Sequence, residues 1–153
     1  MRLLALDVGG RQMGVAISDE TGLIATPVSI IERRSKAEDF SEIAQLVRDW
    51  GVEGLVIGHP LNDDGTSGPQ AQRIERYAAE LVEALRAEGL DVPSTLWDEY
   101  GSTQRAEEIM IASGRTAEER RTRIDAVAAA VILQDYLDAQ RTMASIPVEE
   151  EDV

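Results

Sequence analysis

The sequence of 153 residues contains no cysteine and only one histidine, His59. The absence of cysteine excludes disulfides and thiolate metal sites, and a lone histidine argues against a histidine-based zinc site. A bound metal would therefore be held mainly by oxygen, which points to Mg²⁺ or Mn²⁺ as the cofactor. The chain has no apolar run of about eighteen residues and no basic leader, so we expect no membrane partner and a cytoplasmic location.

Lysine is scarce as well, since Lys36 is the only one among 15 basic residues, against 29 acidic residues and a net charge of −14. This balance argues against general nucleic-acid binding, which usually needs a basic domain. Two features weaken that objection. Four of the acids lie at 149–152, in an acidic segment (142–153) that we expect to be a disordered tail, and the remaining basic residues are arginines, which suit phosphate. The length predicts a single domain over residues 1–141.

Hydrophobic patterning predicts an α/β fold. The expected strands cover residues 2–7, 13–18, 23–30, 54–58 and 93–97. The expected helices cover residues 36–50, 69–88, 102–112 and 123–140, with a mobile arginine-bearing loop at 113–122. Short links favour an antiparallel meander for the first three strands, with Pro27 indicating that the third lies at the sheet edge. Helical crossovers favour parallel pairing for the last two.

Asp7 ends the first buried strand and is followed by Gly9 and Gly10, which leave the backbone open to a ligand. The carboxyl ends of parallel strands share one edge of a sheet, and open α/β sheets bind ligands at that edge. Residues 58–60 and 98–99 are expected at the same edge. An ordinary turn remains the alternative interpretation, because aspartate and glycine are common in turns.

Two more acids are candidates for the same site. We favour Glu99 over Asp98, because neighbouring strand residues point to opposite faces. A glutamate also reaches better across the roughly 10 Å between the first and fifth strands, past Gly58, if the fourth strand lies between them. Asp125 stands in the otherwise apolar segment 124–133, where a charge needs a partner or a cation. The alternatives are a solvated strand end for Glu99 and a first-turn acid stabilised by the helix dipole for Asp125.

Carboxylates that converge repel one another and are tolerated together only with compensating cations. Acidic ligands alone suggest Mg²⁺ or Mn²⁺, and the corresponding chemistry is metal-assisted phosphodiester hydrolysis. In that chemistry one ion activates water and another stabilises the leaving oxygen.

These residues belong to motifs that resemble the YqgF/RuvX family of pre-16S rRNA nucleases, once described as Holliday junction resolvase-like. The matching segments are residues 5–9, 14–19, 58–66, 98–103 and 124–129. The resemblance implies an RNase H-like fold with a five-stranded mixed sheet ordered 3-2-1-4-5 and helices on both faces. It also implies that Asp7, Glu99 and Asp125 are the catalytic, metal-binding acids of an enzyme that trims the 5′ end of pre-16S rRNA.

The chain departs from the family at Gln12 and Tyr100, where arginine is often found. Tyr100 could replace a phosphate contact by stacking on a base. The other residues expected to contact nucleic acid are Arg11, Asn62, Thr66, Ser102, Arg105, Arg121 and Arg123. A solvated basic loop is the alternative for most of the arginines, and a helix start for the loop 62–68. His59, beside Pro60, is expected to be structural.

Several functions stay open beside the nuclease acting on structured RNA. Cleavage of branched DNA by a Holliday junction resolvase would use the same carboxylates but needs a dimer with two sites at fixed separation. No dimer interface is evident in the sequence, so we expect a monomer or weak homodimer. A nucleotide-binding module built on the turn 7–10 would need a second domain. A non-catalytic ribosome-assembly or transcription factor would not need metal at the acids.

Overall fold

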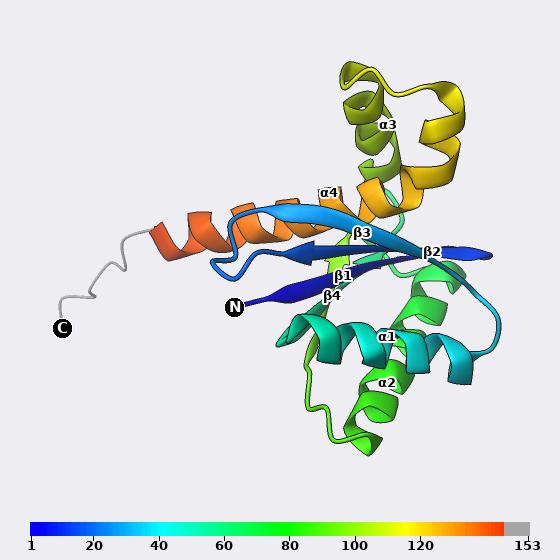
Figure 1. Cartoon of the computed structure of the whole chain (residues 1–153), viewed down its shortest axis with the longest axis vertical. Helices are drawn as coiled ribbons and strands as arrows, with labels where there is room; N and C mark the ends of the chain where they lie inside the picture. The colour runs from blue at the N-terminus through cyan, green and yellow to red at the C-terminus, as the bar shows by residue number, and fades with distance from the viewer. Residues whose placement is uncertain (146–153) are drawn as a thin grey trace.

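The structure is a computed structural model that describes residues 1–145. Its strands are β1 (Leu3–Val8), β2 (Gln12–Ser18), β3 (Ala25–Glu32), β4 (Gly54–His59) and β5 (Ser94–Asp98). They form one sheet in the order β3-β2-β1-β4-β5 (Figure 1). The β1–β2 and β2–β3 pairs are antiparallel, and the β1–β4 and β4–β5 pairs are parallel. The predicted order and mixed pairing are confirmed, including the edge position of the third strand.

Helices cover both faces of the sheet, as predicted. They are α1 (Lys36–Trp50), α2 (Pro69–Ala87), α3 (Ser102–Ala112) and α4 (Ala117–Ser145). Helices α1 and α2 lie on one face, whereas α4 crosses the other and carries α3 on its outer side (Figure 1). Within residues 1–145, no helix has both the length and the apolar character needed to cross a bilayer.

The first two helices start and stop on local signals. Ser35 caps α1, because its hydroxyl oxygen accepts a hydrogen bond from the Glu38 amide at 3.2 Å. Gly51 ends α1 in the left-handed conformation with φ 63°, which favours glycine. Pro69 occupies the first turn of α2, where its missing N–H costs nothing.

The last helix corrects the sequence-based prediction at both ends. It starts at Ala117, so the loop predicted for 113–122 is wrong from residue 117 onward. The Thr116 hydroxyl accepts a hydrogen bond from the Glu119 amide at 3.2 Å and caps the helix there. The first turns of α4 are polar and exposed, so apolar periodicity did not reveal them. At the other end α4 reaches Ser145, which makes the first part of the predicted tail helical, while 146–153 lie outside the described residues.

Alternation along β1 assigns each side chain to one of two cores. Leu4, Leu6 and Val8 face α1 and α2 and join a core of large apolar side chains. Leu3 and Ala5 face α4 and join a second core containing Ala16, Val56, Ala129, Ile132, Leu133 and Leu137. Asp7 continues the second set, because side chains two apart share a face. The acid therefore points toward α4.

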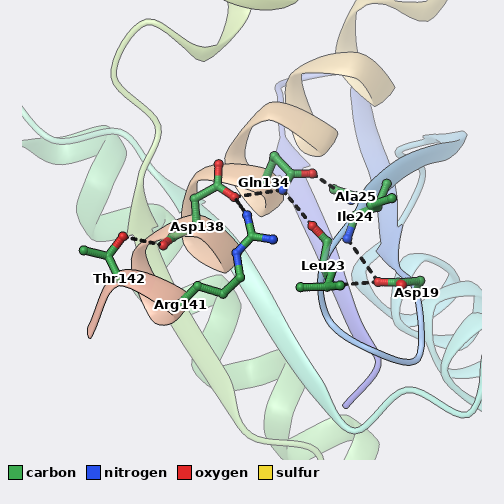
Figure 2. A network of polar contacts seen from close by, with 8 residues as sticks. All are labelled: Asp19, Leu23, Ile24, Ala25, Gln134, Asp138, Arg141 and Thr142. Carbon is green, nitrogen blue, oxygen red and sulfur yellow. Dashed lines mark hydrogen bonds and ion pairs between the residues drawn. The ribbon is translucent and has the colours of Figure 1, made fainter. Parts of the chain in front are cut away.

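A polar clamp fixes α4 on the sheet (Figure 2). The Gln134 side chain accepts a hydrogen bond from the Ala25 amide at 2.9 Å and donates one to the Leu23 carbonyl at 2.9 Å. On the turn itself, the Asp19 carboxylate accepts hydrogen bonds from the Leu23 and Ile24 amides. The turn between β2 and β3 is thus bonded both internally and to α4. This clamp restricts how α4 can slide across the sheet.

Candidate active site

Asp7 lies beneath the backbone of α4. In the sheet register Asp7 is paired with Gly14 of β2. A Cβ at Gly14 would lie 1.9 Å from the carbonyl oxygen of Asp125 and 2.8 Å from the amide nitrogen of Ala126. The α4 backbone therefore rests directly on Gly14, and only glycine leaves room for it. This approach brings Asp125 over the strand pair that carries Asp7.

Glu99 reaches the same place from β5 across a second glycine. A Cβ at Gly58 of β4 would lie 2.6 Å from Oε2 of Glu99 and 3.0 Å from Cδ1 of Ile132. The Glu99 carboxyl thus occupies the space that Gly58 leaves empty, on the way to Asp7. Asp98 is exposed, and its Oδ1 accepts a hydrogen bond from the Tyr100 amide at 3.0 Å. The solvated strand end is therefore Asp98, and Glu99 is the acid directed toward Asp7.

The carboxyl groups of Asp7 and Glu99 form a hydrogen-bonded pair. Burial, followed by the charge of Asp7 and the hydrogen bond to it, raises the pKa of Glu99 to about 8. Burial also raises the pKa of Asp7; the hydrogen bond from Glu99 opposes this shift and the charge of Asp125 adds to it. Glu99 is therefore the member that keeps its proton near neutral pH and donates it to Asp7.

Asp125 is half-buried, and burial raises its pKa. Because α4 begins at Ala117, Asp125 lies in the third turn of the helix rather than in the first. The helix dipole acts mainly on the first turn, so it does not account for this acid. Asp125 lies close enough to Asp7 for its charge to raise the pKa of that carboxyl.

All three acids have the ligand chemistry that a divalent cation requires. Two of them, Asp7 and Glu99, also lie close together. Carboxylate oxygens are the ligands that Mg²⁺ and Mn²⁺ prefer, and Asp7 and Glu99 already converge. Within the described part of the chain, no group of three His, Asp or Glu side chains is drawn close enough to hold a metal ion. Asp7 and Glu99 are thus the preassembled pair, and Asp125 is the more distant third acid.

Seven of the eight residues expected to contact nucleic acid are exposed. Tyr100 follows Glu99 directly and is 73% exposed. The exposed arginines among them are Arg11, Arg105, Arg121 and Arg123. Arg121 lies in the first turns of α4, not in the mobile loop that the sequence predicted, whereas Arg123 is helical as predicted.

Two of the predicted contact residues, Ser102 and Arg105, make interactions within the protein. Ser102 is only 2% exposed, and its amide donates a hydrogen bond to the Glu99 carbonyl at 3.0 Å. Its side chain is buried in this structure, and its contact with a nucleic acid stays a prediction. The Arg105 guanidinium is held by Asp135 of α4, with one N···O distance of 3.0 Å.

The loop after β4 is an internally bonded turn. Asn62 donates a hydrogen bond to the Thr66 hydroxyl at 2.9 Å, and that hydroxyl donates to the Asp64 carboxylate at 2.6 Å. Both predicted contact residues, Asn62 and Thr66, are exposed. His59 lies 3.4 Å from Glu75 of α2, measured from Nε2 to Oε2, which agrees with its expected structural role.

Gly14 contributes to the geometry of the site, and the sequence analysis did not identify it. The sequence presents it only as part of a strand motif, because its contact with residue 125 depends on packing between distant segments. The available signal was its position opposite Asp7 in the first hairpin, where a residue without a side chain is unusual for a buried strand.

A family model described as "RuvX: Holliday junction resolvase" matches residues 1–139. The chain belongs to this family. A relative from Syntrophus aciditrophicus (strain SB), named "Putative pre-16S rRNA nuclease", is 45% identical over 139 residues, covering 91% of this chain and 89% of the relative. A relative of the same name from Geobacillus kaustophilus (strain HTA426) is 42% identical, with coverages of 92% and 100%.

Solved structures similar to this RuvX-family chain include two resolvases. RuvC from T. thermophilus, in complex with a Holliday junction substrate, has a TM-score of 0.57 at 14% identity and covers 92% of this chain and 96% of its own. The Fowlpox virus resolvase bound to junction DNA has a TM-score of 0.55 at 13% identity, with coverages of 92% and 99%. These likenesses confirm the RNase H-like fold. Family and fold together place the chain among nucleases that hydrolyse phosphodiester bonds.

Proposed function

We propose that this RuvX-family chain is a divalent-metal-dependent endonuclease that processes the 5′ end of pre-16S rRNA in the cytoplasm during ribosome biogenesis. The observation that carries the proposal is the contact between the Asp7 and Glu99 carboxyls across Gly58, with Asp125 close enough to act on Asp7. The names of relatives at 45% and 42% identity support the RNA substrate. We assign the activity to residues 1–141, acting as a monomer or weak homodimer.

Each acid has its own part in the proposed chemistry. Asp7 and Glu99 would hold Mg²⁺ or Mn²⁺, and Asp125 would add negative charge or a third ligand from α4. The ion, when bound, supplies Lewis-acid stabilisation and a more acidic bound water. Glu99 must lose the proton that it donates to Asp7 before both carboxyls can act as ligands, so proton release from this pair accompanies metal binding. Half-burial of the pair strengthens its electrostatic interaction with a bound cation.

Branched DNA is the second candidate substrate, since the family description and the fold are those of resolvases. Symmetric cutting of a four-way junction needs two active sites at a fixed separation. A stable dimer would therefore favour the junction, and a monomer favours RNA.

The test compares the wild type with Asp7→Asn on a pre-16S rRNA fragment, a generic single-stranded RNA and a four-way junction, with Mn²⁺ present. Replacement of outer-shell partners of a metal site typically costs 10–100-fold, so loss of a direct ligand should lower cleavage by about 100-fold or more. Asp98→Asn is the matched control, because Asp98 is exposed and its Oδ1 is bonded to the Tyr100 amide rather than to Asp7 or Glu99. It should retain cleavage to within about twofold. Equal cleavage by Asp7→Asn and the wild type would remove Asp7 from the mechanism.

A calorimetric titration with Mn²⁺ separates the enzyme from a non-catalytic ribosome-assembly or transcription factor. The wild type should bind the ion and release protons, whereas Asp7→Asn should bind it much more weakly. Identical titrations for the two proteins would argue for the non-catalytic role.

A further inference from the structure

A cavity of about 340 Å³ lies on the opposite face of the sheet from the acids, between the turn after β1 and the helices α1 and α2. Among the described residues, its lining contains four cationic side chains and no acidic one. The four are Arg33, Lys36, Arg73 and Arg76. The chain has 29 acids and only 15 bases, so this local excess of positive charge runs against its overall composition. We call this feature the basic cavity.

Two of the four cations belong to the wall of the basic cavity. Arg33 donates a hydrogen bond to the Gly9 carbonyl at 2.6 Å, and its guanidinium lies 5.1 Å from the ring centre of Tyr77. Lys36 lies 2.7 Å from a carboxylate oxygen of Glu80. These contacts fix the shape of the basic cavity and partly neutralise its charge.

Arg73 and Arg76, both on α2, have open donors. Neither guanidinium takes part in an ion pair within 4.0 Å or a side-chain hydrogen bond among residues 1–145. Arg76 has only a weak electrostatic interaction with its helix neighbour Glu75. Two unpaired guanidinium groups at one cavity suit an anion with several oxygens, because the planar fork matches phosphate bidentately.

The basic cavity and the acids lie on opposite faces of the sheet, on either side of the end of β1. Val8 lines the cavity, whereas the preceding residue, Asp7, faces α4. Apart from its chain neighbours, no atom of residues 1–145 lies within 4 Å of the position that a Cβ of Gly10 would occupy, so the turn offers little obstruction. Packed layers lie roughly 10 Å apart, so a strand that crosses this turn can reach from the acids to the basic cavity within a few nucleotides.

We propose that the basic cavity binds a backbone phosphate of the substrate strand a few nucleotides from the phosphodiester at Asp7 and Glu99. Arg73 and Arg76 make the contact, and the strand passes over the turn at Gly10. This inference rests on the proposed nuclease function for the identity of the strand, and it explains how so acidic a chain holds a polyanion. It also defines the path of the strand, which runs from the basic cavity over the turn at Gly10 to the acids.

The test measures binding of a labelled single-stranded RNA long enough to reach both sites, over a series of salt concentrations and with EDTA present. The double variant Arg73→Gln/Arg76→Gln should bind at least about tenfold more weakly. Its log–log salt slope should be shallower by roughly 0.7 for each phosphate that is no longer neutralised. The control Arg48→Gln/Arg86→Gln removes two ion-paired arginines, one from the last turn of α1 and one from the last turn of α2. Its affinity for the RNA should match that of the wild type within about twofold. Thermal melts check that both variants fold.

Because EDTA removes divalent ions, this binding assay does not depend on metal binding or cleavage at the catalytic acids. Unchanged affinity and salt slope in Arg73→Gln/Arg76→Gln would overturn the basic-cavity proposal, and so would a wild type that binds no RNA under these conditions. Cleavage that is indifferent to Asp7→Asn would overturn the proposed function and leave the binding result standing.

Inorganic phosphate serves as a second probe. If phosphate raises the melting temperature of the wild type but not of Arg73→Gln/Arg76→Gln, while RNA binding is equal in both, the cavity holds a small free anion. That result would overturn the assignment to the nucleic-acid strand. If the double variant loses both the stabilisation by phosphate and the tight binding of RNA, the assignment to the nucleic-acid strand is supported.

Discussion

The two faces of the sheet are built from side chains of different size. The face under α1 and α2 buries large residues, among them Leu4, Leu6, Ile57 and Leu81. The face under α4 has small residues near the acids, with Gly14, Ala5 and Gly58 on adjacent strands. Large side chains supply hydrophobic free energy in proportion to the area they bury. Small ones let a helix backbone come close enough for acids on separate elements to meet. Stability and site geometry are thus concentrated on opposite faces.

The largest effect should come from Gly14→Ala, which adds one methyl group to the face under α4. That methyl would overlap the Asp125 carbonyl, 1.9 Å away, and a helix backbone cannot yield as a flexible side chain can. We expect more than about 3 kcal/mol of lost stability and cleavage reduced by about 100-fold or more, because Asp125 is displaced. Thermal unfolding and the cleavage assay measure the two effects. Wild-type values for both would show that α4 does not depend on this close approach.

Leu81→Ala should destabilise the core between the sheet and the helices α1 and α2 without changing the positions of the acids. Leu81 is fully buried against the sheet from α2, and such truncations cost about 2–5 kcal/mol. Cleavage per folded molecule should stay within about twofold of the wild type at low temperature. Urea titration measures the stability loss, and Val82→Ala, at a half-buried neighbouring position, should cost less. A selective loss of activity in Leu81→Ala would contradict the division between the faces.

Gly58→Ala should act mainly on the chemistry. Its new methyl would meet Oε2 of Glu99 at 2.6 Å and Cδ1 of Ile132 at 3.0 Å, and both are ends of side chains that can rotate. Stability should fall by only about 1 kcal/mol, whereas cleavage should drop about tenfold as Glu99 moves away from Asp7. Parallel melting and cleavage measurements separate the two. A large stability loss with normal cleavage per folded molecule would argue that the Glu99 position is unimportant.

The last expected effect is a pH dependence of stability without divalent ions. The pKa of Glu99 in the folded protein, about 8, lies above its usual value of 4.5, so the folded state binds more protons between these values. Stability should therefore decline as pH rises from 4.5 toward 8. Glu99→Gln should flatten this decline, since an amide does not titrate in that range. Urea titrations at several pH values provide the measurement, and an equal slope in the variant would place the titration elsewhere.

Local pattern determined the strands, the edge position of β3, the spans of α1 and α2 and the preference for Glu99 over Asp98. Alternation with period two and helical periodicity report which side of an element meets an apolar environment, and β5 obeys that rule. The family resemblance implied the full strand order, which periodicity alone does not give. The polar start of α4 escaped detection, because exposed turns leave no apolar pattern.

Only the tertiary structure decided which distant surfaces meet. The contact of Gly14 with Asp125, the burial of Ser102 and the convergence of Arg73 and Arg76 with Arg33 are of this kind. Such contacts depend on how far apart two packed layers lie and how they are rotated. Those quantities arise from the summed packing of many side chains, so no single segment of the chain encodes them.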